Sequence, residues 1–145
     1  DRVLADLDLV IASVHSGLHE EKDVMTRRIL TVLSNEHVDI LGHPTGRLIP
    51  SRPAYQVDMD RVIEAARAAG TALEINASPF RMDLDDPQIR EARDRGVKLA
   101  IGTDAHSREE LGNMGHGVTL ARRGWCGPGD ILNTLDREAL LRWAS

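Results

Sequence analysis

The sequence predicts one α/β domain in which parallel strands alternate with helices. Two observations support this prediction. Short apolar segments rich in strand-forming residues recur along the chain, and segments with the apolar spacing of a helix separate them. Consecutive strands joined through helices of this length need crossover connections, so the strands are expected to be parallel. Four such units suggest half of an α/β barrel or a small open sheet.

The elements are expected in strict alternation. Strands are predicted at 7–15, 38–43, 71–76 and 97–103, and helices at 20–35, 57–69 and 87–95. Gly70 and Gly96 are expected to end helices, and Pro87 to begin one. After Ser107 the chain is expected to be helical, with glycine-rich breaks at 112–117 and 124–129 and one or two amphipathic helices over 131–143.

Composition limits the possible functions. The net charge of −5 argues against strong independent binding to nucleic acid, which needs a basic surface, but it allows a nuclease whose DNA is delivered by another domain. No apolar run approaches the roughly 20 residues of a membrane span, so no membrane association is expected. The single cysteine, Cys126, rules out an internal disulfide and is consistent with a cytoplasmic location. We expect no function for Cys126 itself.

Polar side chains follow the predicted strands where each strand ends. His15, His43 and Asn76 end the first three strands, and Asp104 and His106 follow the fourth. Parallel α/β folds gather their sites at the carboxyl ends of their strands, so these side chains are expected to converge. Alternation along each strand predicts that they share a face with residues that precede them, namely Ile11 and Ser13, Leu41, Glu74, and Ala100 and Gly102.

Histidine and aspartate at such a position favour a catalytic metal site. Neutral imidazole and carboxylate bind manganese, zinc or iron, and a site without cysteine is more typical of catalysis than of structural zinc. Each residue also has an ordinary alternative: a buried histidine, a helix cap at Asp104, or a surface histidine at His106. Their coincidence at strand ends favours the metal site over those alternatives.

Two further classes of site are not supported. The stretch GNMGHG (112–117) lacks the spacing of a dinucleotide-binding loop and follows no strand, and no GxSxG elbow of a serine hydrolase is present. Of the remaining histidines, His19 and His37 are expected at the surface, and His116 is a weaker candidate ligand. Arg47 and Arg81 are candidate catalytic residues that contact phosphate oxygens, with solvated loop arginines as the alternative.

Several motifs resemble the PHP (polymerase and histidinol phosphatase) domain. They are SVHSG (13–17), GHPTGRLI (42–49), LEINASPFRMDL (73–84), GTDAHS (102–107) and ARRGW (121–125). The resemblance covers essentially the whole chain. GHP and TDAH are general to PHP proteins, whereas the combination of the longer motifs is closest to the carboxyl-terminal PHP domain of bacterial family X DNA polymerases.

The resemblance implies a fold, a cofactor and an activity. It implies a distorted (βα)7 barrel with up to three divalent metals, manganese, zinc or iron, at the carboxyl ends of its strands, where they serve phosphoester hydrolysis. Carried over by motif, the metal ligands are His15, His43, Asp104 and His106. For the polymerase-linked branch it implies a 3′-to-5′ exonuclease in DNA repair. The alternatives are a non-catalytic structural or interaction domain and a phosphatase of the histidinol-phosphate type.

The family's amino-terminal ligands, an HxH pair, an Asp-His pair and a bridging glutamate, have no counterpart here. Residues 1–145 are therefore expected to form a partial PHP domain that lacks the amino-terminal part of the barrel. Such a piece exposes apolar strand faces and an open edge, so we expect self-association if it stands alone. In a complete protein, other domains of the same chain would deliver the DNA.

Overall fold

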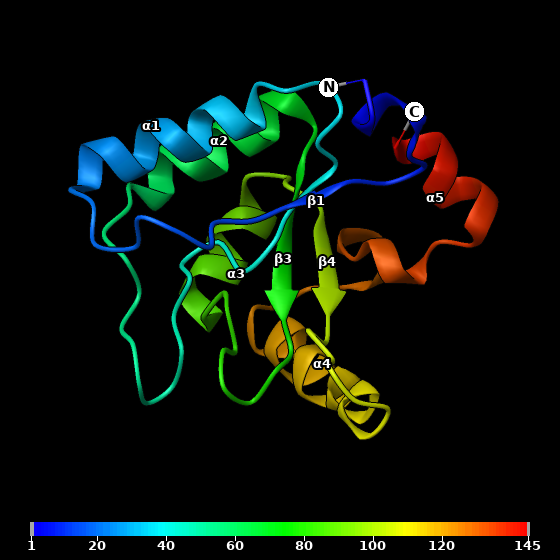
Figure 1. Cartoon of the computed structure of the whole chain (residues 1–145). Coiled ribbons are helices and arrows are strands. Elements are labelled where there is room, and N and C mark those ends of the chain that lie inside the picture. Colours follow the sequence, from blue (N-terminus) through cyan, green and yellow to red (C-terminus); the bar gives the residue numbers. More distant parts are fainter. Residues whose placement is uncertain (1, 145) are drawn as a thin grey trace.

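The computed structural model describes residues 2–144 and contains the predicted parallel sheet. Its four strands are β1 (Ile11–Ala12), β2 (Ile40–Leu41), β3 (Ala72–Asn76) and β4 (Leu99–Gly102). They lie in the order β1-β2-β3-β4, and every neighbouring pair is parallel (Figure 1). The α/β class and the alternation of strands with helices are therefore confirmed, and the sheet is consistent with part of a βα barrel.

The strands are shorter than the sequence predicts, most of all the first. β1 has two residues where the apolar run predicts nine over 7–15, and it pairs only with β2. Just before it, the Val10 N–H donates to the Asp39 carboxylate at 2.6 Å instead of to a strand. Apolar character alone marks the run, but a residue joins a strand only where a neighbouring backbone is within reach. His15 consequently lies in the loop that follows β1.

Five α-helices and four short 3₁₀ segments make up the rest of the described elements. The helices are α1 (Lys22–Leu33), α2 (Met59–Ala69), α3 (Asp86–Asp94), α4 (Met114–Arg123) and α5 (Arg137–Ala144). The 3₁₀ segments are η1 (Leu4–Asp6), η2 (Glu109–Asn113), η3 (Pro128–Asp130) and η4 (Leu132–Thr134). Gly70 and Gly96 follow α2 and α3 with φ of 75° and 80°, so both glycines end helices as predicted.

The predicted break at 112–117 is wrong. α4 begins at Met114 and contains both Gly115 and Gly117. A Cβ on Gly117 would lie 2.3 Å from Ile101 Cγ2 and 2.9 Å from Ala77 Cβ. The glycine is therefore needed for close packing of the helix on β4 rather than for a turn. The second predicted break is confirmed, because α4 ends at Arg123, next to Gly124.

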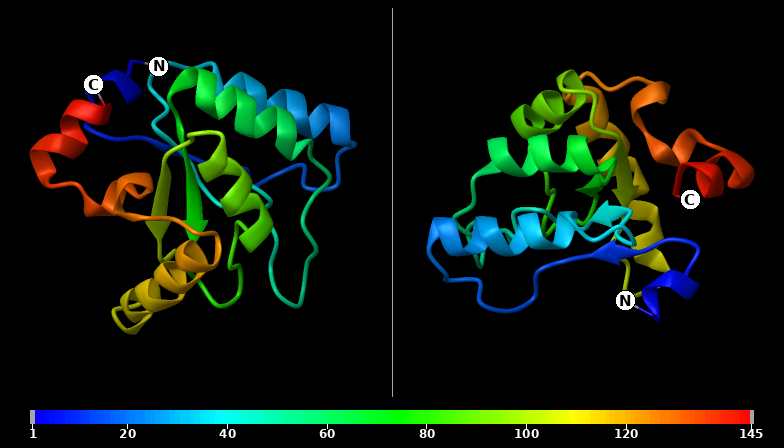
Figure 2. Two further views of the ribbon diagram at one scale, coloured as in Figure 1. Left: turned by 180° about the vertical axis from the view of Figure 1, so that it is seen from behind. Right: turned by 90° about the horizontal axis from the view of Figure 1, so that it is seen from above.

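The two faces of the sheet are covered differently. Helices α1, α2 and α3 lie on one side of the strands, and η4 with α5 lies on the other (Figure 2). The side covered by α1, α2 and α3 holds the main core, which includes Leu41, Leu73, Ile75, Leu99 and Ile101. The opposite face carries a smaller cluster of Ile40, Ala72, Ala100 and Leu132, packed against Leu9, Leu140 and Trp143.

One expected face assignment is wrong. Leu41 faces the main core under α1, α2 and α3 and does not lie on the face that carries Ile40. β2 ends at Leu41, and the backbone turns at His43, where φ is 30°. The two-residue alternation therefore stops before His43 and cannot place its side chain. Ile11, Glu74, Ala100 and Gly102 do share the predicted face, since all four line one cavity of about 200 Å³ on that side.

The outer edge of β4 is partly covered by the segment that follows α4. Ile131 forms a parallel bridge with Leu99. The Asn133 side chain accepts the Ile101 N–H at 2.7 Å and donates to the Ile101 carbonyl at 3.0 Å, as a neighbouring strand would. At the other edge, β1 pairs on one side only and Ile11 is exposed. Self-association through this edge stays a prediction. Within residues 2–144, no helix has the length and apolar character needed to cross a membrane.

The start of α3 offers a test of local helix stability. Asp85 forms a capping box: its carboxylate accepts the Gln88 N–H at 3.0 Å, and the Gln88 side chain accepts the Asp85 N–H at 3.3 Å. Asp85→Ala is expected to lower the free energy of unfolding by about 1 kcal/mol, measured by urea denaturation. As a control, Glu64→Ala, which removes an exposed ion pair on α2, should change it by less than about 0.5 kcal/mol. Equal effects of the two variants would contradict the capping role.

Candidate metal and phosphate site

Two of the predicted ligands lie side by side. The ring centroids of His15 and His43 are 5.1 Å apart, with the rings nearly perpendicular at 83°. His43 is buried, whereas His15 is exposed and its Nε2 lies 2.7 Å from Ser13 Oγ. The two residues come from the loops after β1 and β2, which are neighbours in the sheet. The predicted convergence at the carboxyl ends of these strands is therefore present.

His43 carries a nitrogen that needs a partner. Its Nδ1 is buried and makes no hydrogen bond among residues 2–144. Burial lowers the pKa of His43 below its ordinary value of about 6.5, and the positive charge of Arg81 lowers it further. The imidazole is therefore neutral at physiological pH, which is the form that binds metal ions. Buried polar atoms in native proteins normally have partners, so an orphaned imidazole nitrogen is a feature that a metal ion would explain.

Asp104 and His106 follow β4 but make other contacts. Asp104 has a left-handed backbone, with φ of 52°, and its Oδ2 accepts a hydrogen bond from Arg81 Nε at 2.7 Å. This ion pair is largely shielded, with 14% of the Arg81 side chain and 28% of the Asp104 side chain exposed. His106 is exposed, and its Nδ1 lies 2.7 Å from the Asp104 carbonyl oxygen. One Asp104 oxygen and His106 Nε2 are left without such contacts within the described chain.

The residues fit a metal ion in part. Within residues 2–144, no three histidine, cysteine, aspartate or glutamate side chains lie close enough together to surround one. The adjacent His15 and His43 rings and the orphaned His43 Nδ1 nevertheless suit two ligands of a divalent metal. Arg81 already binds one oxygen of Asp104, so that carboxylate would offer a metal its other oxygen.

Arg47 and Arg81, the candidate phosphate contacts, join two loops. Arg47 Nε donates to the Arg81 carbonyl at 2.7 Å, and its Nη2 donates to the Met82 carbonyl. In return, Arg81 Nη1 donates to the Arg47 carbonyl at 3.4 Å. Both side chains are half-buried, so neither is a freely solvated loop arginine. Their contact with phosphate stays a prediction.

Two buried carboxylates, Glu74 and Asp83, also lie at the site. Neither is among the site residues predicted from the sequence. Glu74 accepts the His43 N–H at 2.5 Å, and Asp83 accepts the Thr45 and Gly46 N–H groups at 3.0 Å each. Burial raises the pKa of both carboxyl groups, and these hydrogen bonds oppose the rise. An acidic residue inside the apolar stretch TALEIN is a visible signal for Glu74. Asp83 lies within the motif LEINASPFRMDL, but nothing in the local sequence indicates its partners, which lie almost 40 residues earlier.

The other histidines stay outside the site. His19 and His116 are exposed, and His37 is half-buried before β2, where its N–H donates to the Asn35 side chain at 3.0 Å. The expectation of surface positions is met for His19 and only partly for His37. Asn76, which ends β3 as predicted, donates to Glu74 at 3.2 Å and so supports the site from within.

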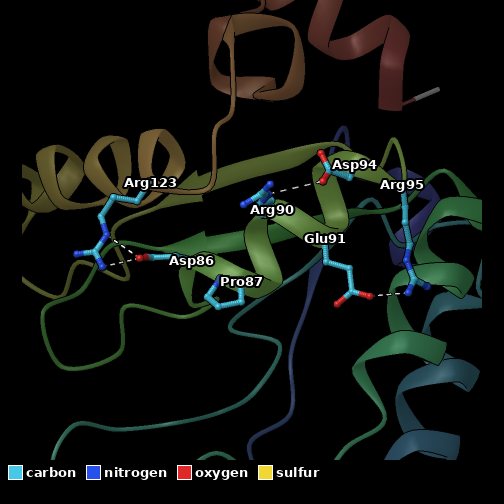
Figure 3. Close-up of a pocket in the computed structure, with 7 residues that line it drawn as sticks. All are labelled: Asp86, Pro87, Arg90, Glu91, Asp94, Arg95 and Arg123. Atoms are coloured by element: carbon cyan, nitrogen blue, oxygen red, sulfur yellow. Dashed lines mark hydrogen bonds and ion pairs between the residues drawn. The ribbon is translucent and has the colours of Figure 1, made fainter.

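One cavity lies away from the site, along α3, and none of these residues lines it. This cavity of about 500 Å³ is lined by Asp86, Pro87, Arg90, Glu91, Asp94, Arg95 and Arg123. Figure 3 shows that its arginines face acidic partners: Arg123 pairs with Asp86, Arg95 with Glu91 and Arg90 with Asp94. Because acids neutralise its arginines, this cavity is a poor site for a phosphate group.

Cys126 is predicted to be unreactive. Burial raises the pKa of its thiol to about 11, and the negative charge of Asp130 acts in the same direction. The thiolate is the reactive form, so alkylation by iodoacetamide at pH 7.5 should be at least about tenfold slower than for a free thiol of ordinary pKa. Unfolding in urea should restore the ordinary rate. Fast alkylation of the folded protein would show that Cys126 is ionised and accessible.

Fold and site together define a parallel α/β protein with histidine and carboxylate side chains at the carboxyl ends of its strands. No protein-family model matches the chain. The DNA polymerase/3′-5′ exonuclease PolX of Bacillus subtilis is 48% identical over 145 residues, which is 98% of this chain and 25% of that protein. The chain is therefore similar to part of this polymerase, in agreement with its resemblance to the PHP domain of family X DNA polymerases.

Two probable phosphatases are also similar to the chain. A probable phosphatase of Caldanaerobacter subterraneus is 33% identical over 129 residues, which is 83% of this chain and 48% of that protein. A probable phosphatase of a Thermoanaerobacter species is 31% identical over 141 residues, which is 91% of this chain and 55% of that protein. The chain thus spans about half of these phosphatases and a quarter of PolX.

Proposed function

We propose that this chain is part of a metal-dependent phosphoesterase, the 3′-5′ exonuclease module of a family X DNA polymerase. The observation that supports it most is the buried, unpartnered Nδ1 of His43 beside His15, at the carboxyl ends of neighbouring parallel strands. The PolX relative is a DNA polymerase and 3′-5′ exonuclease and is more similar in sequence than the phosphatases, which favours the nuclease.

His15, His43, Asp104 and His106 would hold the metal, which is manganese, zinc or iron. A bound divalent metal lowers the pKa of water to supply hydroxide and stabilises charge that develops on the phosphate. The chain's own contribution is to keep His43 neutral and to orient Asp104 through Arg81. Four residues of this kind make up part of the family's ligand set, and the amino-terminal part of a complete domain would supply the others.

Arg47 and Arg81 are proposed to contact the scissile phosphate. Each guanidinium keeps one terminal nitrogen, Nη1 of Arg47 and Nη2 of Arg81, that makes no hydrogen bond among residues 2–144. A planar guanidinium with a donor to spare suits a phosphate oxygen. Because the same side chains also hold the two loops together, replacing either one would disturb the loops as well as any substrate contact.

The nucleic acid would come from other parts of a longer protein. The net charge of −5 is unsuited to independent DNA binding, and the chain matches only a quarter of PolX. A phosphatase acting on a small phosphomonoester is the second candidate, and the similarity to probable phosphatases favours it.

The test uses full-length protein with single-stranded DNA labelled at its 5′ end. With manganese, the proposal expects a ladder of products shortened from the 3′ end, and removal of metal by a chelator should abolish it. Hydrolysis of histidinol phosphate with intact DNA would support the phosphatase instead. If the protein cleaves neither substrate although it binds manganese, the non-catalytic alternative holds.

A further inference from the structure

Glu74 is a buried carboxylate that binds the backbone of a proposed metal ligand. Only 9% of the residue is exposed. Its Oε2 accepts the His43 N–H at 2.5 Å and the Asn76 Nδ2 hydrogen at 3.2 Å. A Cβ on Gly102 would lie 2.1 Å from Glu74 Oε1, so β4 has a glycine where the carboxylate fits against it.

The backbone that Glu74 binds is unusual. His43 has φ of 30°, a left-handed conformation that costs free energy for a residue with a side chain and persists where surrounding contacts hold it. After His43, the Thr45 and Gly46 N–H groups both donate to the Asp83 carboxylate. Three N–H groups of the loop 43–46 therefore donate to two buried carboxylates. Glu74 accepts the hydrogen bond from the His43 N–H.

We propose that Glu74 is a positioning residue that fixes the backbone of His43 and thereby aims its imidazole at the metal. The inference rests on the proposed function, because it assigns His43 the role of a ligand. Glu74 reaches the imidazole through the main chain, since its hydrogen bond is to the His43 amide. Removing a hydrogen-bond partner of a metal-ligating group typically weakens metal affinity 10-fold to 100-fold, and we expect a loss in this range for a contact that orients the ligand through its main chain.

The first test needs no metal. In metal-free full-length protein, the amide proton of His43 should resonate downfield and exchange slowly, because it donates to a carboxylate. Glu74→Ala should shift it upfield and speed its exchange, while Glu74→Gln, which keeps an oxygen acceptor, should largely restore both. Ile63→Val, a conservative change in the buried core of α2, controls for destabilisation and should leave the His43 amide unchanged.

The second test measures manganese affinity of the same variants by titration. Glu74→Ala should bind manganese roughly 10-fold to 100-fold more weakly, with Glu74→Gln and Ile63→Val close to wild type. An unchanged His43 amide, or unchanged affinity, in Glu74→Ala would overturn the proposal. Failure of wild-type protein to bind manganese, or equal binding by His43→Ala, would overturn the proposed function, and the metal-free spectrum would still show whether Glu74 fixes His43.

Discussion

Replacing His43 with alanine is expected to abolish metal binding and phosphodiesterase activity together. The substitution removes the buried nitrogen that has no other partner, and with it one half of the His15–His43 pair. An open metal site that loses a ligand loses both its source of hydroxide and its charge clamp, so activity should fall on the order of 100-fold or more. Bound metal is measured by elemental analysis, and activity by the manganese-dependent nuclease assay on full-length protein.

His37→Ala is the matched control for that experiment. It also removes one histidine, but from a half-buried position ahead of β2 and outside the site. Metal content and activity should stay at wild-type levels. Full nuclease activity in metal-depleted His43→Ala would remove the metal mechanism and leave the structural alternative.

The second large effect is a pair of opposite changes within α4. Gly117→Ala would place a methyl group 2.3 Å from Ile101 Cγ2 and 2.9 Å from Ala77 Cβ, and the latter is fixed to its backbone and cannot rotate away. Such overpacking costs about 1–3 kcal/mol, more than the gain of up to about 1 kcal/mol in helix propensity. The free energy of unfolding should therefore fall.

Gly115→Ala should do the reverse. No atom lies within 4 Å of the Cβ that it would add, so only the gain in helix propensity remains. Stability should rise by about 0.5–1 kcal/mol, measured by urea denaturation beside Gly117→Ala. Stabilisation by both substitutions would show that α4 does not pack closely on β4.

The order and direction of the elements were predictable because apolar spacing reflects which residues face a core. Glycine was the ambiguous residue. Gly70 ends a helix as expected. Gly117 lies inside one, where the absence of a side chain allows α4 to pack closely against Ile101. Sequence spacing does not distinguish a glycine needed for a turn from one needed for packing. Strand length was overestimated because it depends on where a neighbouring backbone can pair with the strand, which the apolar pattern does not indicate.

The candidate site was partly predictable. Strand ends indicated that His15 and His43 would meet, and their rings do. The expectation that Leu41 and His43 share a face by two-residue alternation failed, because the turn at His43 interrupts the alternation. The Arg81–Asp104 ion pair joins loops 23 residues apart, and the Glu74 bond to His43 spans 31 residues. Local periodicity carries no information on such contacts between segments that are distant in the sequence.

The most direct test of the metal site is the position of manganese in crystals of the full-length protein. Anomalous scattering should place a manganese ion within about 2.3 Å of His43 Nδ1, with His15 and an Asp104 oxygen beside it. Anomalous peaks found only elsewhere, for example among the carboxylates of the α3 cavity, or no peak near His43 at saturating manganese, would contradict the assignment of His43 as a metal ligand.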